Sequence, residues 1–141
     1  RTECAALGEA PAEARAILAA APIAGEPDFL LHKTTERSAY RPFDPPAGIF
    51  DTLLWNARGE LTEFTRGNLI VEIDGARLTP PLSCGLLPGT LRAELIERGE
   101  IAEGVVRVAE LARVRALWFI NSVRGRIPVR LATDSQAVIP E

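Results

Sequence analysis

The chain has 141 residues, 47% apolar and 25% charged, which suits one globular domain with a hydrophobic core. A net charge of −3 and scattered basic residues exclude an obvious nucleic-acid or anionic-membrane footprint. No apolar stretch is long enough to span a bilayer, and two cysteines with one histidine, His32, provide neither a disulfide framework nor a zinc site. We therefore expect a cytoplasmic protein without a metal. The chain begins at Arg1 and contains no methionine, which suggests a piece of a longer protein.

The pattern of the chain changes near Phe29. Residues 9–21 are alanine-rich with apolar spacing that predicts a short helix, followed by a turn-rich linker. From Phe29 onward, short β-like runs follow one another: FLLH, GIFDTLLWN, NLIVEI, ARLT, VVRV and ALWFINSV. Pro128 and the polar tail from Thr133 are expected to end the ordered structure.

Local signals also predict turns and helices between these runs. Residues 56–59 and the pair Asp74-Gly75 are typical of hairpin turns. Residues 89–98 predict one clear helix, which a following glycine closes, and residues 109–114 a second short one. The expected fold is α+β, dominated by antiparallel strands with helices on the outside.

Lys33 follows directly after a strongly apolar β-like stretch. Burial penalises the charged ammonium, and a neutral amine is what imine chemistry with a carbonyl cofactor requires. The alternative is a lysine at a strand end whose ammonium reaches water. From this segment alone the alternative is the commoner case.

Glu63 lies among hydroxyl and small residues between two predicted strands, in the segment GELTEFTRGNLIV. A carboxylate there could accept a hydrogen bond from a protonated ring nitrogen, although an exposed turn glutamate gives the same pattern. Asn68 is expected to brace the loop through side-chain-to-backbone bonds.

A Pro-Gly pair precedes the predicted helix in the segment LSCGLLPGTLRAEL. The free N–H groups of Thr90 and Leu91 would point outward from its first turn, and such a helix end attracts phosphate. The pair could also mark only a helix start. An amine, a carboxylate and an anion cup are together the three groups that pyridoxal phosphate needs.

The strings HKTTERSAYRP, FDTLLWNARGELTEFTRGNLIVEIDGARLTPPLSCGLLPGTLRAEL and ALWFINSVRGRIPV also resemble the aminodeoxychorismate lyases and branched-chain aminotransferases of fold type IV. The likeness covers about residues 25–131 and is closest to the lyase segment fused behind component I in bifunctional para-aminobenzoate synthases. It implies the larger cofactor-binding domain of these enzymes, with curved, mostly antiparallel, barrel-like sheets and flanking helices.

The resemblance implies a role for each matching residue. Lys33 matches the lysine that holds pyridoxal 5'-phosphate as a Schiff base, and Glu63 the acid that pairs with the pyridine nitrogen. The backbone at Thr90 and Leu91 and the hydroxyl of Ser122 match positions that hold the phosphate. Arg37 matches a basic position near the cofactor.

Two further arginines, Arg124 and Arg126, are candidates for a substrate carboxylate, since a guanidinium matches that geometry. Surface placement is equally open for both.

Relatives carry a smaller N-terminal domain, of which residues 1–24 would be only a residual helix and linker, whereas residues 25–141 would be the large domain. We therefore expect weak cofactor binding by the chain as given, and a homodimer in the intact enzyme. Transamination of branched-chain or D-amino acids would use Lys33 and Glu63 in the same way, so it remains an alternative. A non-catalytic remnant that serves interaction or dimerisation is another.

Overall fold

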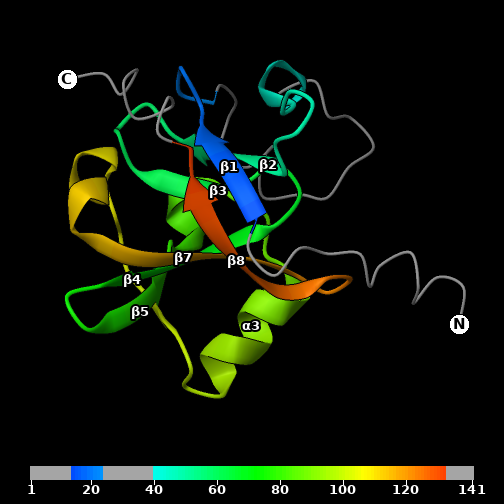
Figure 1. Cartoon of the computed structure of the whole chain (residues 1–141). Coiled ribbons are helices and arrows are strands. Elements are labelled where there is room, and N and C mark those ends of the chain that lie inside the picture. Colours follow the sequence, from blue (N-terminus) through cyan, green and yellow to red (C-terminus); the bar gives the residue numbers. More distant parts are fainter. Residues whose placement is uncertain (1–13, 24–39, 133–141) are drawn as a thin grey trace, which may run out of the picture.

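The computed structural model describes residues 14–23 and 40–132 (Figure 1). These residues form one eight-stranded sheet in the order β3-β2-β1-β8-β7-β4-β5-β6. The strands are β1 (Ala14–Leu18), β2 (Asp51–Trp55), β3 (Leu61–Phe64), β4 (Asn68–Ile73), β5 (Ala76–Thr79), β6 (Ala102–Glu103), β7 (Val114–Asn121) and β8 (Gly125–Leu131). The helices are α3 (Thr90–Glu97) and the 3-10 turns Arg41–Phe43, Leu82–Cys84 and Val108–Arg113.

The sheet is mixed and strongly curled. Strand β1 runs parallel to both β2 and β8, β5 runs parallel to β6, and the remaining pairs are antiparallel. The chain just beyond β6, at one edge, meets the start of β3 at the other edge, where Leu61 N donates to Val106 O at 2.8 Å. The sheet therefore approaches closure as a half-barrel, which confirms the expected α+β class and its curved, barrel-like sheet.

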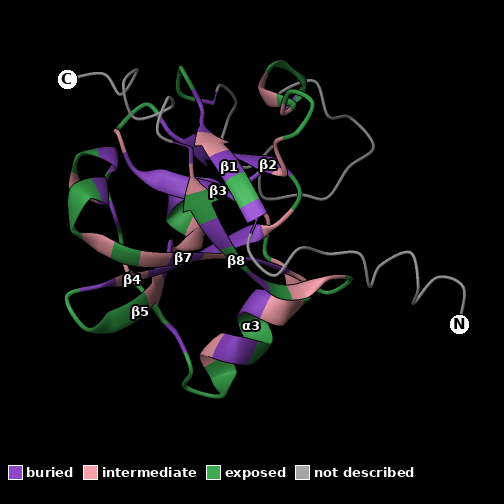
Figure 2. Cartoon of the chain, in the orientation of Figure 1, coloured by how far each residue is buried: buried purple, intermediate pink, exposed green. Residues whose placement is uncertain are grey.

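The main core fills the inside of the curl, and a smaller one lies under α3 (Figure 2). Strand β4 belongs to both cores, because Leu69 and Val71 pack inside the curl and Ile70 packs towards the helix. On the helix side, Leu95 of α3 covers Ile70 together with Ile120 of β7. This double burial explains why NLIVEI is a nearly continuous apolar run.

The helix predicted over residues 9–21 is wrong where the structure describes that segment, because residues 14–18 form β1. Burial alternates along the strand: Ala14, Ala16 and Leu18 are buried, whereas Arg15 is exposed. This period of two is the pattern of a strand with one face in the core. Hydrogen-bonded pairing of β1 with β2 on one side and β8 on the other outweighs the helix propensity of alanine.

Pro128 does not end the ordered structure, since β8 continues through it to Leu131. Among the described residues, β1 pairs with β8 only from Val129 onward, so β8 at Pro128 has a partner only on the β7 side. A strand with one free side tolerates proline, because no hydrogen bond is lost there. The predicted strand VVRV is reduced to an isolated antiparallel β-bridge between Arg107 and Glu60, because a 3-10 turn begins at Val108.

The locally encoded elements are confirmed. Asp74 and Gly75 adopt φ angles of 53° and 81°, as a tight hairpin between β4 and β5 requires. Helix α3 begins at Thr90 and is followed by Gly99 with a φ of 78°, and a 3-10 turn covers most of the predicted second helix. No helix within the described ranges is long and apolar enough to cross a membrane.

Candidate active site

A cavity of about 500 Å³ opens where β3, the start of α3 and the turn between β7 and β8 meet. Four of the predicted site residues line it: Glu63, Thr90, Leu91 and Ser122. The other lining residues are Thr65, Arg66, Gly67, Asn68, Leu87, Pro88, Gly89, Asn121 and Val123. The fold thus brings together groups that are far apart along the sequence.

The carboxylate of Glu63 forms one polar wall of this cavity. Glu63 lies within strand β3 and is 3% exposed, so the prediction that it lies between strands, and the alternative of an exposed turn glutamate, are both wrong. The hydroxyl of Tyr40 donates to Glu63 Oε2 at 2.8 Å, and the backbone N–H of Leu87 donates to Oε1 at 3.2 Å. Each oxygen of the buried Glu63 carboxylate thus accepts a hydrogen bond from a neighbouring element.

The first turn of α3 and the β7–β8 turn supply hydrogen-bond donors to the same cavity. The first N–H groups of any α-helix have no acceptor within the helix. In α3 the N-cap residue is Gly89, which has no side chain to accept from them. The hydroxyls of Thr90 and Ser122 contact each other across the two elements. Hydroxyls and free N–H groups at a helix start form a suitable cup for an anion.

The segment Leu87–Gly89 joins the carboxylate to this anion cup. Asn68 donates through Nδ2 to Leu87 O at 3.0 Å, so it braces a loop as expected, although a different loop from its own. A Cβ at Gly89 would lie 2.2 Å from Asn68 Oδ1, which only glycine avoids. The start of α3 is therefore packed directly against the side chain of Asn68.

Asp51 was not predicted as part of the site. It is fully buried and accepts hydrogen bonds from Thr65 N, from the Thr65 hydroxyl and from Arg66 N, at 3.2, 2.5 and 3.2 Å. These bonds hold the β3–β4 turn that lines the cavity. The available signal was an acidic residue inside the apolar run GIFDTLLW.

The two candidate substrate arginines occupy different places. Arg124 follows the cavity-lining Val123, is half-buried, and its guanidinium lies 5.7 Å from the centre of the Phe50 ring. Arg126 instead pairs with Glu100 at 3.2 Å and lines no part of the cavity. The structure thus leaves Arg124 as the candidate beside the cavity.

Lys33 and Arg37 lie outside the described residues, as does His32. Their roles stay predictions. Within the described residues the chain resumes at Tyr40, seven positions after Lys33, where the Tyr40 hydroxyl contacts Glu63.

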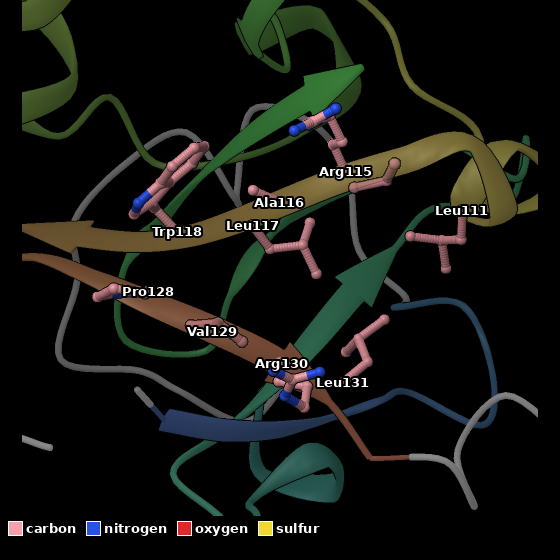
Figure 3. A pocket seen from close by; sticks show the side chains of 10 residues that line it. Leu111, Arg115, Ala116, Leu117, Trp118, Pro128, Val129, Arg130 and Leu131 are labelled. Atoms are coloured by element: carbon pink, nitrogen blue, oxygen red, sulfur yellow. The ribbon is translucent and has the colours of Figure 1, made fainter. Parts of the chain in front are cut away.

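A second hollow of about 380 Å³ lies over β7 and β8 (Figure 3). Its lining includes Leu111, Arg115, Trp118 and Arg130, and none of the predicted site residues. Cys84 is buried, and burial together with the nearby charge of Glu60 raises the pKa of its thiol to about 11. Such a thiol is a poor nucleophile, so the cavity at Glu63 is the candidate active site.

The fold and this cavity define a class of protein. The family model of amino-transferase class IV matches residues 45–132, more than half of the chain, and the chain belongs to this family. The resemblance noted in the sequence is thereby confirmed.

Individual relatives agree with this assignment. The chain is 38% identical over 77 residues to the "putative aminodeoxychorismate lyase" of Schizosaccharomyces pombe, which covers 52% of the chain and 33% of that protein. It is 36% identical to a solved "putative amino-acid aminotransferase" from Mesorhizobium loti, with a TM-score of 0.77 and coverage of 84% of this chain and 59% of the other. It is 28% identical to the 4-amino-4-deoxychorismate lyase from Pseudomonas aeruginosa, with a TM-score of 0.72 and coverage of 84% and 47%. The chain thus spans from a third to about three fifths of the length of these relatives.

Proposed function

We propose that the chain is the cofactor-carrying part of a pyridoxal-phosphate enzyme that converts 4-amino-4-deoxychorismate to para-aminobenzoate and pyruvate. The observation that supports this most is the cavity that joins the buried Glu63 carboxylate to the donors of Thr90 and Ser122. Its volume of about 500 Å³ lies in the range of sites for small ligands. The family and the Pseudomonas aeruginosa lyase support the same assignment.

The residues present fit the cofactor. Glu63 would accept a hydrogen bond from the protonated pyridine nitrogen, because its buried carboxylate faces the cavity. The first N–H groups of α3 at Thr90 and Leu91, with the hydroxyl of Ser122, would hold the phosphate. Lys33 would hold the aldehyde carbon, and Arg37 would lie near the cofactor, as the resemblance implies.

When bound, pyridoxal phosphate supplies a carbonyl for the substrate amine and an electron-withdrawing ring. With the substrate bound, the amine of Lys33 would take the proton from the amine-bearing carbon as a general base. Glu63 would keep the proton on the ring nitrogen through its negative charge. Loss of the enolpyruvyl group leaves an aromatic ring, which makes this step strongly downhill.

Transamination of an amino acid is the second candidate, since the Mesorhizobium loti protein with 36% identity is named as an aminotransferase. Both reactions would use Lys33 and Glu63 in the same roles. The fusion to a synthase component, the homodimer and the cytoplasmic location stay part of the proposal.

The test is to load the full-length protein with the cofactor and to supply each substrate in turn. The lyase predicts pyruvate release from 4-amino-4-deoxychorismate without a keto-acid acceptor, whereas an aminotransferase requires one. Glu63→Ala should keep part of the cofactor binding but lose turnover, while the exposed Glu97→Ala on α3 serves as the control. If the protein binds the cofactor but releases no pyruvate from 4-amino-4-deoxychorismate, the lyase assignment is refuted.

A further inference from the structure

Two turns meet at the rim of the cavity, one between β3 and β4 and one between β7 and β8. Asn121, at the end of β7, ties them together. Its Nδ2 donates to Arg66 O at 3.0 Å, and its Oδ1 accepts from Arg124 N at 2.7 Å. Both turns also line the cavity, through Arg66 and Val123 among others. The backbone at the rim is therefore held by one side chain with two bonds.

Each turn places an arginine beside the same aromatic ring. The guanidinium carbon of Arg66 lies 5.2 Å from the centre of the Phe50 ring, and that of Arg124 lies 5.7 Å from it. Phe50 in turn packs edge-on against the buried Phe119, at 4.8 Å and 81°. A guanidinium beside an anchored ring gains cation–π attraction and loses freedom. The guanidinium groups of Arg66 and Arg124 thus both lie close to the Phe50 ring.

The charges at this rim do not cancel. Asp51 is fully buried and pairs with Arg66, Oδ2 to Nε, at 3.3 Å. Arg124 has no ion pair in the part of the chain that the structure describes. Guanidinium groups stay charged at all ordinary pH values, so Arg124 is a cation without an acidic partner among the described residues, whereas Arg66 is paired with Asp51.

The geometry points to a binding site for a carboxylate of the substrate, formed beside the cavity by Arg66 and Arg124, whose guanidinium groups both lie near the Phe50 ring. An anion there would relieve the repulsion between the two cations. A guanidinium presents parallel N–H donors, which match the two oxygens of a carboxylate. The substrate is then an amino compound that also carries a carboxylate. This inference rests on the proposed function and names a specificity-determining pair for it.

The shared chemistry is an oxyanion, and the cofactor phosphate is a second possible source of it. The experiment therefore measures binding of the carboxylate ligand and binding of the cofactor separately on the full-length protein. Binding of para-aminobenzoate is compared with binding of aniline, the same ring without the carboxylate, by calorimetry or ligand-observed NMR. Pyridoxal phosphate binding is followed by its absorbance in a parallel titration, which tests the proposed function independently.

Arg124→Gln is the main variant, because Arg66→Gln would leave the buried Asp51 without its ion pair. We expect Arg124→Gln to weaken para-aminobenzoate binding by about tenfold or more, as loss of a charged hydrogen bond predicts, with aniline and cofactor binding unchanged. Arg124→Lys should restore only part of the affinity, since an ammonium lacks the planar fork. The control is Arg113→Gln, which removes an exposed arginine paired with Asp74 and outside the cavity lining.

Three results would overturn the inference. Unchanged para-aminobenzoate affinity in Arg124→Gln would exclude a role for this guanidinium. An equal loss for aniline would indicate altered cavity shape and no carboxylate contact. An equal loss of affinity for pyridoxal phosphate would indicate that the arginine binds the cofactor phosphate and not a substrate carboxylate. Absence of any cofactor binding by the wild type would instead count against the proposed function, whatever the two probes do.

Discussion

Gly89→Ala should destabilise the domain although its backbone conformation suits alanine. Gly89 has φ −65° and ψ 149°, a region open to any residue. The added Cβ would lie 2.2 Å from Asn68 Oδ1, about 1 Å closer than ordinary van der Waals contact. Asn68 is buried and held to Leu87 O, so it cannot turn aside without loss of that hydrogen bond.

The expected cost combines two effects. Overpacking in a well-packed region costs about 1–3 kcal/mol, and the lost Asn68–Leu87 hydrogen bond about 1 kcal/mol. Urea unfolding monitored by Trp fluorescence should therefore show a midpoint lowered by about 1 M or more at an unchanged slope. Gly104→Ala is the comparison variant, because its Cβ would come within 2.9 Å of the Leu78 side chain, which can shift without loss of a hydrogen bond.

A double-mutant cycle tests the cause. In an Asn68→Ala background the obstructing oxygen is gone, so Gly89→Ala should cost close to nothing there. The coupling free energy would then be close to the full cost of Gly89→Ala in the wild type, about 2–4 kcal/mol. If Gly89→Ala lowered the midpoint equally in both backgrounds, or did not lower it at all, contact with Asn68 would not be the reason for glycine at this position.

Two more expected outcomes concern the site, and a third concerns the buried Cys84. Lys33→Ala in the full-length protein should abolish the visible absorbance of bound pyridoxal phosphate, and a variant that stays fully active would end the assignment of its role. Tyr40→Phe removes the hydroxyl that donates to Glu63 at 2.8 Å; it should cost about 1–3 kcal/mol in urea unfolding, and an unchanged midpoint would show that the bond adds nothing. Burial raises the pKa of the Cys84 thiol to about 11, so its thiolate is scarce at pH 8. In a Cys4→Ser background, iodoacetamide should modify the native protein roughly a hundredfold more slowly than a free thiol, and equal rates would contradict this.

Sequence patterns predicted the elements whose causes are local. The Asp74-Gly75 hairpin needs only two residues with positive φ, and α3 needs a start and a closing glycine. Strand β1 is different, because its alanine-rich sequence favours a helix in isolation. It becomes a strand through pairing with β2 and β8, whose paired residues are more than 30 positions away along the chain.

The site was predictable only as a set of separate groups. Glu63 and Thr90 each had a structural alternative when considered by their own neighbours in sequence, and Ser122 was named only through the resemblance. The resemblance to a family selected them, and the fold then placed them around one cavity. Asp51 was missed because its partners, Thr65 and Arg66, follow it at a distance that no local pattern encodes.

Residues 87–89 connect the Glu63 carboxylate at one end of the cavity to the start of α3 at the other. Leu87 donates its N–H to Glu63 and accepts at its carbonyl from Asn68, while Gly89 packs against the same Asn68 and is the N-cap of α3. The distance from the carboxylate to the first N–H groups of the helix is thus set by backbone atoms, which have less freedom than long side chains. A rigid ligand with a ring nitrogen at one end and a phosphate at the other requires such a constant spacing. A substitution that loosens residues 87–89 should therefore weaken binding at the carboxylate and at the start of α3 together, even where it contacts neither Glu63 nor Thr90.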